Sequence, residues 1–477
     1  MSTFSGLNTA TTALWAAQRG LDVTGQNIAN VNTAGYSRQR VDLAAMGGTA
    51  VPAVHSVSDA SDGGVDVEGV RRVRDAFLEA RAQLETGTTA RLTAESEALG
   101  RVEEAFREPG TTGIQSMLAG VWTSFSNLAN NPLKLAPRGE VLERLDTLAA
   151  GIRTTRASLD QQWDQTHDAL SALSADVNTA ATSIAELNHA IRQATLSGLP
   201  ANELSDRRDA LVLRLSEAVG ATGVSRDHGV VDVVVGGTSL VSGSTAIAVR
   251  FTGASGPDEV PADRPRLVAD PGGTALRVGG TAAGQLTALT STVPSYRTQL
   301  DDLARSLAAT FNAQHTQGFD ATGARGLPLF DDGSGAAAVD LTRVTAANIS
   351  LRALTSDQVA ASATDPATIG GAVSADGKNA DAVYRLSLDT AGLDATYRKL
   401  VVALGVKSSV AARDLEVQSA VSVQVDAARE SVSGVNLDEE MTNMLSFQHA
   451  YGAAARMVTA IDQALDTLIN RTGVVGR

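Results

Sequence analysis

Apolar residues recur every seven positions near the start of the chain, and a second row follows each of them by three positions. The rows consist of Leu7, Leu14, Leu21 and Ile28, and of Ala10, Ala17, Thr24 and Val31. This spacing places both rows on one face of an α-helix and is typical of a helix that packs lengthwise on another helix. The pattern predicts that the helix ends at Ala34–Gly35, since glycine commonly follows a helix end.

The last forty residues show the same seven-residue pattern. The rows consist of Leu437, Met444, Tyr451, Val458 and Leu465, and of Phe447, Ala454, Ile461 and Leu468. Glu440 interrupts the second row, and Asn436 followed by Glu439 resembles a capping box at the start of the helix. Either helix alone could be an ordinary core helix. Two such faces at opposite ends of the chain favour helices that pair with each other or with neighbouring molecules.

A third and longer face occupies residues 142–194, where two heptad rows are apolar except at Arg156 and Thr166. No proline or glycine interrupts residues 152–197. A helix over 142–194 would be about 80 Å long at 1.5 Å per residue, which predicts a rod-like domain. Further helices are expected at 70–106, 203–219, 284–315 and 395–431.

The helical patterns are interrupted by segments of a different kind. Residues 221–283 alternate with a period of two and are rich in β-branched residues, which predicts a small antiparallel sheet. Residues 46–66 predict an extended linker, and 316–394 an irregular segment with a strand within 340–351. The expected fold is mainly α with a β insertion, built on paired N- and C-terminal coiled-coil helices.

These patterns predict four structural regions. The expected regions are a terminal helical domain (1–45 and 432–477), a long-helix rod domain (46–220, 284–318 and 395–431), a small β subdomain (221–283) and an irregular or β outer region (319–394).

Composition narrows the possible functions. The 477 residues carry 39 Lys+Arg and 53 Asp+Glu, a net charge of −14, which disfavours binding to nucleic acid or to an anionic membrane. The absence of cysteine excludes disulfides, thiolate catalysis and cysteine-ligated metals. No apolar run reaches membrane-spanning length, so no membrane insertion is expected. The start of the chain lacks the pattern of a cleaved signal peptide.

The sequence predicts no catalytic, cofactor-binding or metal-binding residue and no cofactor. The six histidines lack metal-ligand spacing, and Asp320, Asp331 and Asp332 lack the alternation of a calcium loop. The adjacent acids Glu439 and Glu440 would point about 100° apart on a helix, so we expect them not to converge. The chain is therefore not expected to be an enzyme.

Residues 27–39 form an asparagine-dense polar segment, NIANVNTAGYSRQ, directly after the first apolar face. One interpretation is a helix end and turn, in which asparagine and glycine adopt left-handed conformations. Another is a recognition loop, because tyrosine and arginine are favoured at interfaces. The candidate interface residues are Asn27, Asn30, Thr33, Gly35, Tyr36, Arg38 and Gln39.

This segment resembles the signature of the bacterial flagellar rod, hook and hook-associated axial proteins. The stretch SGVNLDEEMTNMLSFQHAYGAAARMVTAIDQALDTLIN at 433–470 resembles the matching C-terminal helix. Similarity in ANELSDRRDALVLRLSEAVG, DVVVGGTSLVSG and LARSLAATFNAQHTQGFD favours the hook-associated junction members. The resemblance covers about 1–45, 140–245, 284–320 and 395–477.

The resemblance implies a structural subunit that joins hook to filament and assembles through its terminal helices. The implied N-terminal contacts are Leu7, Leu14, Leu21 and Ile28. The implied C-terminal contacts are Leu437, Met444, Phe447, Tyr451, Val458, Ile461, Leu465 and Leu468. Implied partners are other copies in a ring, the hook protein, a second hook-associated junction protein, and an export chaperone on the C-terminal helix. The implied location is the hook–filament junction, reached by type III export.

Other interpretations remain open. A hook or rod axial protein would share the terminal signatures, although the long helical pattern of 142–194 argues against it. A secreted enzyme on an axial scaffold, such as a cell-wall hydrolase, would need its catalytic domain in 316–394, which shows no paired acid and base. A soluble coiled-coil signalling module would not need the segment at 27–39.

Overall fold

The computed structural model describes residues 3–46, 63–336 and 338–470. These residues form two compact units. The first unit comprises the described parts of 1–87, 178–248 and 420–477, and the second comprises those of 88–177 and 249–419. The fold is mainly α with small antiparallel sheets, as the sequence predicts.

Three long helices contribute residues to both units: α2 (Ala76–Phe106), α4 (Leu135–Leu196) and α9 (Leu393–Ser433). The apolar face predicted for α4 is confirmed, because Leu145, Trp163 and Ile184 are completely buried. The polar exception at Arg156 is also buried. Its guanidinium donates to Asp160, 3.1 Å away, and to Asp301, 2.5 Å away, so its charge is neutralised inside the second unit.

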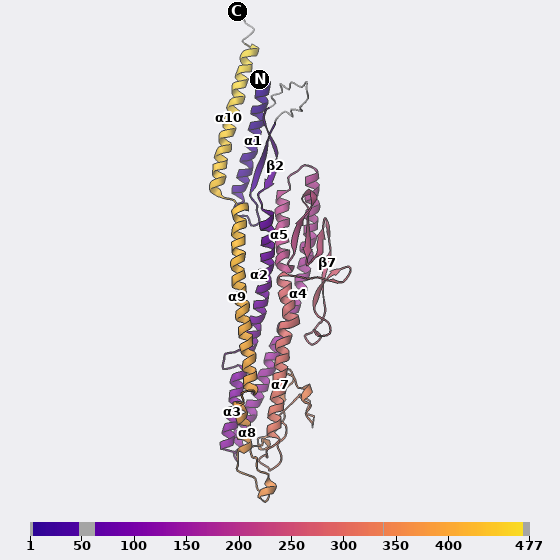
Figure 1. Ribbon diagram of the computed structural model, residues 1–477, viewed down its shortest axis with the longest axis vertical. Coiled ribbons are helices and arrows are strands. Elements are labelled where there is room, and N and C mark those ends of the chain that lie inside the picture. The colour runs from indigo at the N-terminus through magenta and orange to yellow at the C-terminus, as the bar shows by residue number, and fades with distance from the viewer. Residues whose placement is uncertain (1–2, 47–62, 337, 471–477) are drawn as a thin grey trace, which may run out of the picture. The chain divides into compact units, whose positions relative to one another are not determined.

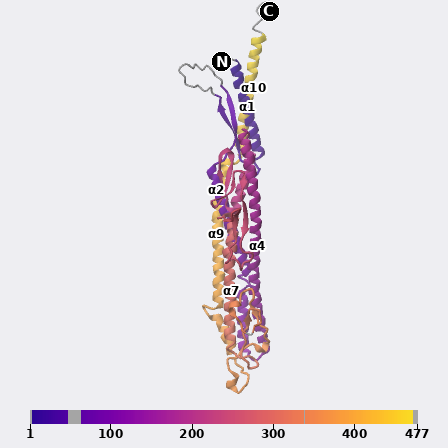
Figure 2. The same ribbon diagram turned by 90° about the vertical axis from the view of Figure 1, so that its right-hand side faces the viewer.

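In the first unit, α1 (Thr3–Ala29) lies along α10 (Leu437–Asn470), as both Figure 1 and Figure 2 show. Ala10, Ala17 and Thr24 are buried. At Gly20 the helices approach so closely that an added Cβ would lie 2.5 Å from the ring of Phe447. The predicted pairing of the two terminal helices therefore exists within one chain.

The first helix ends at Ala29, before the predicted end at Ala34–Gly35. Asn30 and Thr33 instead form turns, in which the Thr33 N–H donates to the Asn30 carbonyl at 2.9 Å. Gly35 has a positive φ of 80°, which glycine adopts without strain.

The prediction of a helix starting at residue 70 is wrong. Residues Val65–Arg72 form β2, which pairs antiparallel with β1 (Gln39–Ala45). The alternating run VDVEGVRRV thus reflects a strand, and α2 begins only after Asp75, whose Oδ1 accepts the N–H of Phe77 at 2.8 Å. Phe77, in the first turn of α2, is exposed. The predicted linker at 46–66 lies largely outside the described residues.

The first unit also contains α5 (Asn202–Val219) and a four-stranded antiparallel sheet. The strands are β3 (Thr222–Ser225), β4 (Val231–Val235), β5 (Thr238–Ser242) and β6 (Thr245–Ala246), in that order, with the 3-10 turn η1 (Asp227–Gly229) between β3 and β4. The sheet predicted for 221–283 is in fact two sheets. The other consists of β7 (Ala248–Thr252), β8 (Arg266–Asp270) and β9 (Thr274–Ala275).

The second unit has an aromatic core. Trp122 and Phe311 stack with ring centroids 5.0 Å apart, and Phe125 and Phe330 pack on Phe311. The helices that bring these rings together are α3 (Ile114–Asn130) and α7 (Val293–His315), and the unit further contains α6 (Gly280–Thr287), a π-helical segment η2 (Ala288–Thr292) and α8 (Lys378–Arg385). Neither α3 nor α8 was predicted from the sequence.

The segment 319–394 is largely irregular, as predicted. Its short elements are β10 (Phe330–Asp331), β11 (Ser350–Leu351) and the 3-10 turns η3 (Leu341–Arg343), η4 (Ser356–Gln358), η5 (Pro366–Ile369) and η6 (Leu386–Leu388). Val359 and Ala360 are completely buried, so this segment contributes to the core of the second unit. Buried His315 accepts the N–H of Ala360 at Nε2, and its Nδ1 lies 2.6 Å from the carbonyl of Leu327.

Candidate interaction site at the chain termini

Asn27 is the hub of the predicted N-terminal motif. It lies in the last turn of α1 and is 1% exposed. Its amide nitrogen donates to the Gln39 carbonyl (2.9 Å) and to Glu440 (3.0 Å), and its amide oxygen accepts from the Tyr36 hydroxyl (2.8 Å) and the Gln39 N–H (2.9 Å). All the bonding capacity of the amide is therefore used within the chain.

Arg38 ties this motif to the start of α10. Its Nε donates to Glu440 and its Nη1 to Glu439, both at 2.8 Å, and its backbone N–H donates to the Ser433 carbonyl at 2.9 Å. The two glutamates point to different sides, one exposed and one buried, but the long arginine fork reaches both of them. Glu440 occupies a position of the apolar row and is 2% exposed. Its buried carboxylate is accommodated there because Arg38 and Asn27 donate to it.

Asn436 begins α10 by accepting the N–H groups of Asp438 (3.0 Å) and Glu439 (3.4 Å) at its side-chain oxygen. This is the capping contact expected from the sequence. In a full capping box the Glu439 side chain would accept the backbone N–H of Asn436. Glu439 instead binds Arg38.

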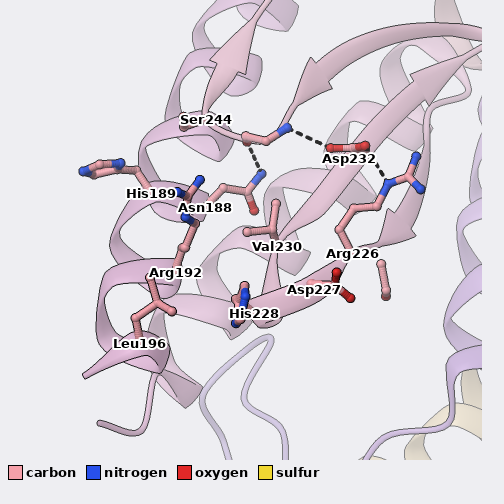
Figure 3. Close-up of a pocket in the computed structure, with 12 residues that line it drawn as sticks. Asn188, His189, Arg192, Leu196, Arg226, Asp227, His228, Val230, Asp232 and Ser244 are labelled. Atoms are coloured by element: carbon pink, nitrogen blue, oxygen red, sulfur yellow. Dashed lines mark hydrogen bonds and ion pairs between the residues drawn. The ribbon is translucent and has the colours of Figure 1, made fainter. Parts of the chain in front are cut away.

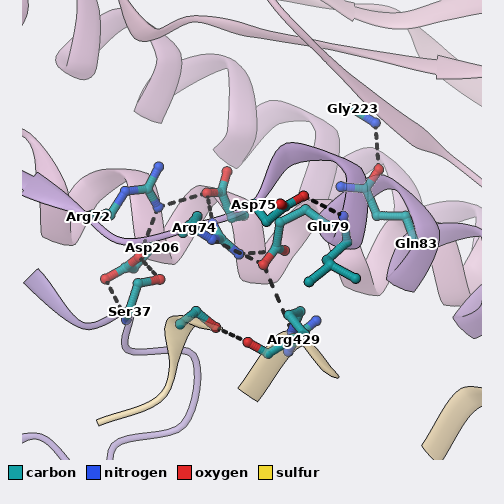
Figure 4. Close-up of polar contacts among 12 residues, drawn as sticks. Ser37, Arg72, Arg74, Asp75, Glu79, Gln83, Asp206, Gly223 and Arg429 are labelled. Atoms are coloured by element: carbon teal, nitrogen blue, oxygen red, sulfur yellow. Dashed lines mark hydrogen bonds and ion pairs between the residues drawn. The ribbon is translucent and has the colours of Figure 1, made fainter. Parts of the chain in front are cut away.

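A second cluster of charges continues from the motif toward α5, as Figure 4 shows. The Ser37 hydroxyl donates to Asp206 at 2.8 Å, and the Arg72 guanidinium donates to Asp206 and Asp209 at 2.8 Å each. Arg74 binds Asp209 and pairs with Glu79 at 2.6 Å. The cluster thus links the motif, the β1–β2 hairpin and two helices of the first unit.

Burial and charge shift the pKa values in this cluster. Burial alone would raise the pKa of Asp209, but the cations of Arg208, Arg72 and Arg74 hold that pKa below its usual value. For Tyr36, burial together with the nearby carboxylates of Asp206 and Glu440 raises the pKa to about 12. The Tyr36 hydroxyl therefore remains protonated and donates to Asn27.

The structure thus brings together four of the seven predicted motif residues. Tyr36, Arg38 and Gln39 surround Asn27, and the side chain of Gln39 accepts from Asn202 at 3.1 Å. Asn30 and Thr33 instead bond to each other at 3.2 Å. Thr33 and Gly35 are exposed beside a groove of about 750 Å³ that lies wholly within the first unit.

The predicted apolar contacts fall into two groups. The half-buried group contains Leu7, Leu14, Leu21, Ile28, Met444, Phe447, Val458, Ile461 and Leu465. Leu437, Tyr451 and Leu468 are exposed. Further exposed apolar side chains of α10 are Met441, Leu445, Met457 and Ile469, which are distributed around several sides of the helix. The exposed side chain of Trp15 gives α1 an outward apolar anchor as well.

Sequence reasoning missed Arg72, Asp206 and Asp209, and treated Glu440 only as an interruption. A signal existed at each place. A single charged residue inside an otherwise apolar row implies a buried partner, and the run DRRD at 206–209 places alternating charges on an amphipathic helix. Identifying the partners requires the fold, because Arg38 and Glu440 are about four hundred residues apart.

The first unit also contains a depression of about 810 Å³ between the end of α4 and the sheet, shown in Figure 3. The polar side chains of Asn188 and Asp232 in this depression form hydrogen bonds with other residues of the unit. Asn188 donates to the carbonyls of Val231 and Gly243 at 2.7 Å each, and Asp232 accepts from Arg226 and the Gly243 N–H at 2.8 Å each. These contacts fix the helix to the sheet and form no catalytic arrangement.

Among the residues that the structure describes, no three histidine or acidic side chains are grouped closely enough to hold a metal ion. Within the same residues, no helix combines the length and the apolar character needed to cross a membrane.

Comparisons with known proteins agree with this geometry. The family model described as "Flagellar hook-associated protein FlgK helical domain" matches residues 99–330. Models described as "Flagella basal body rod protein" and "Flagellar basal body rod FlgEFG protein C-terminal" match 7–36 and 429–471, the two helices joined by Arg38 and its partners. Fold and termini thus define a structural protein of the bacterial flagellum.

Full-length relatives give the particular family. Flagellar hook-associated protein 1 of Bacillus subtilis is 30% identical and covers 100% of both chains, and that of Escherichia coli is 28% identical over 97% of this chain and 99% of its own. The chain belongs to the flagellar hook-associated protein 1 family. The flagellar hook junction protein FlgK from Burkholderia pseudomallei shares its fold, with a TM-score of 0.62 at 17% identity over 74% of this chain and 100% of that one.

Proposed function

We propose that this chain joins the flagellar hook to the filament and that copies of it assemble in a ring through their terminal helices. The observation that carries the proposal is the α1–α10 pair. One face of α10 packs within the chain, with Phe447 against Gly20, while apolar side chains on its other sides, including Met441, Leu445 and Met457, remain exposed. Exposed apolar surface of this extent is typical of a site that a partner covers.

The proposal includes the regions and partners that the family suggests. Residues 1–45 and 432–477 would form the inner tube, and the long helices a surrounding rod domain. The hook protein would lie on one side and the second hook-associated junction protein on the other. An export chaperone would cover the C-terminal helix before type III export. The protein would act by geometry, without catalysis and without a cofactor.

Deletion of the gene tests this function directly. We expect cells without the protein to carry hooks but no filaments, and to release flagellin into the medium, with both defects reversed by the intact gene. Electron microscopy of the cells and immunoblotting of the medium measure the two effects. Normal filaments in the deletion strain would refute the junction role, and loss of the hooks themselves would indicate a hook or rod protein instead.

A further inference from the structure

The outward side of α9 in the second unit carries a row of exposed valines. We call it the valine face; it consists of Lys399, Val402, Val406, Val410, Arg413 and Val417. Val402, Val406 and Val417 are 59%, 58% and 62% exposed. The opposite side of the same helix contains buried Leu400 and Leu404. Valine is a weaker helix former than alanine, so an exposed valine row gives α9 no local advantage.

A different outward side, on α4, carries acids and small residues in the same unit. We call it the acidic face; it consists of Asp146, Ala157, Asp164, Asp168, Ala172 and Ala175, all of them exposed. Between Asp146 and Asp176 the only lysine or arginine residues of α4 are Arg153 and Arg156. Both bond inside the unit, Arg153 to the carbonyl of Ile349 and Arg156 to Asp301. No lysine or arginine of this stretch therefore pairs with the acidic face, and its one basic neighbour there is His167, whose Nδ1 lies 3.5 Å from Asp168.

The two faces complement each other in charge and in shape. Lys399 and Arg413 lie on the same side of α9 as the valines, about 21 Å apart at 1.5 Å per residue. Asp146 and Asp164 lie on the same side of α4 as Ala157, about 27 Å apart by the same rise, so each cation can reach one acid. Alanine lets a neighbouring helix approach closely, so the valines can pack between the acids while the cations pair with them. Figure 2 shows α4 and α9 at opposite edges of the second unit.

We infer that the valine face of one copy docks on the acidic face of the next copy; this inference rests on the proposed assembly into a ring. A contact between two different faces of identical subunits repeats around the assembly and closes a ring when the rotation permits. The charge pairs would set the register and exclude a valine-to-valine contact, because Lys399 and Arg413 would then repel their counterparts.

Charge exchange tests the contact. In Lys399→Glu/Arg413→Glu, and separately in Asp146→Lys/Asp164→Lys, we expect at least a tenfold loss of hooks that bear filaments, counted by electron microscopy. In the chain with all four changes, the number of hooks that bear filaments should return to within about twofold of the wild type. Each copy then presents two faces whose charges are exchanged but still complementary. The matched control is Arg277→Glu/Lys378→Glu, which makes the same charge change at exposed sites of the same unit and should have no effect.

A cross-link reports the contact independently of filament growth. Because the chain contains no cysteine, Val406→Cys/Ala157→Cys introduces the only two thiols, and mild oxidation of assembled flagella should give a ladder of multimers. Either single variant should stop at dimers or monomers. Normal filaments in the gene deletion strain would refute the proposed function, whereas the cross-linked ladder tests only the contact between copies. Charge variants that assemble like the wild type, failure of the fourfold variant to recover, or absence of a ladder from assembled flagella would each overturn the docking inference.

Discussion

Arg38 is the residue on which the joining of the two chain ends most directly depends. Its guanidinium bonds a nearly buried carboxylate, Glu440, and an exposed one, Glu439. Replacing Arg38 by alanine leaves Glu440 with Asn27 as its remaining side-chain donor. A buried charge that loses a charged hydrogen-bond partner costs about 2 kcal/mol.

We therefore expect Arg38→Ala to reduce the stability of the α1–α10 pair by about 2 kcal/mol. Faster amide hydrogen exchange in residues 20–29 and 437–447 would measure the change. Glu439→Ala is the control, because it removes only the exposed half of the arrangement and should cost less than about 1 kcal/mol. Equal effects of the two substitutions would contradict the assignment of Glu440 as the main partner.

His315 gives the second unit a specific dependence on pH. Burial, with a smaller contribution from the nearby Arg138, lowers its pKa to about 4 despite the raising effects of the Leu327 carbonyl and Asp320. In the unfolded chain histidine titrates near 6.5, so between these values the unfolded state binds the additional proton. The stabilisation is therefore complete above pH 6.5 and is lost as the pH falls toward 4.

The expected loss from this histidine is about 3 kcal/mol, because each pKa unit corresponds to about 1.4 kcal/mol. Urea unfolding at pH 7 and pH 4.5 measures it. Trp122 is a suitable fluorescent reporter, since it stacks on Phe311 of the same helix as His315. His315→Gln should be less stable at pH 7 but should lose less stability on acidification. An unchanged pH slope in that variant would refute the role of His315.

At the scale of the element, periodicity predicted the helices that pack lengthwise on other helices. It did not predict the start of α2, or the helices α3 and α8. The long apolar face of α4 could be predicted because its apolar rows continue for many helical turns, a pattern that strands and loops do not show. The start of α2 was placed too early because a strand with the sequence VDVEGVRRV leads directly into it. Helix α8 has only eight residues, and the stacking of Trp122 on Phe311 that positions α3 involves residues far apart in sequence.

Two glycines of α1 provide a matched test of how closely it packs on α10. A Cβ at Gly20 would lie 2.5 Å from the Phe447 ring, whereas a Cβ at Gly25 would meet nothing within 4 Å. We expect Gly20→Ala to destabilise the helix pair by about 1–3 kcal/mol, since the ring must shift in a packed contact. Gly25→Ala should stabilise α1 by about 0.5–1 kcal/mol, because glycine disfavours the helix interior.

Amide exchange of α1 and the fluorescence of Trp15, the only tryptophan of the described first unit, would follow both variants. If Gly20→Ala stabilised α1 as much as Gly25→Ala, the close contact between Gly20 and Phe447 would not exist in solution.

At the scale of the whole molecule, the family could be predicted from the terminal motifs, but the roles of their residues could not. The sequence suggested that Tyr36 and Arg38 face a partner molecule, whereas they bond within the chain to Asn27 and Glu440. A sequence shows which residues suit an interface and does not show whether the other side of it belongs to the same chain. The exposed apolar side chains of α10 and the exposed Trp15 remain available for partners at this end of the chain.

The two sides of α10 make a final prediction possible for assembly. Val458 is half-buried on the side that also contains Ile461, whereas its neighbour Thr459 is exposed and donates only to the Ala455 carbonyl of its own helix. Val458→Asp places a charge where α10 packs, and burial of an unpaired charge costs several kcal/mol. Thr459→Asp makes the same chemical change on the solvent side and leaves the packing intact.

We expect Val458→Asp to weaken binding of the export chaperone and to prevent incorporation at the hook tip, while the helical content of the second unit is unchanged. Isothermal titration with the purified chaperone and labelling of hooks in cells measure the two steps. Chaperone binding should depend on the apolar side of α10 because regularly spaced apolar residues determine the affinity of a helix bound in a groove. If Val458→Asp bound and assembled as well as Thr459→Asp, the partners would use other apolar side chains of α10, such as Met441 or Met457, and the side with Val458 and Ile461 would serve only to pair the two ends of the chain.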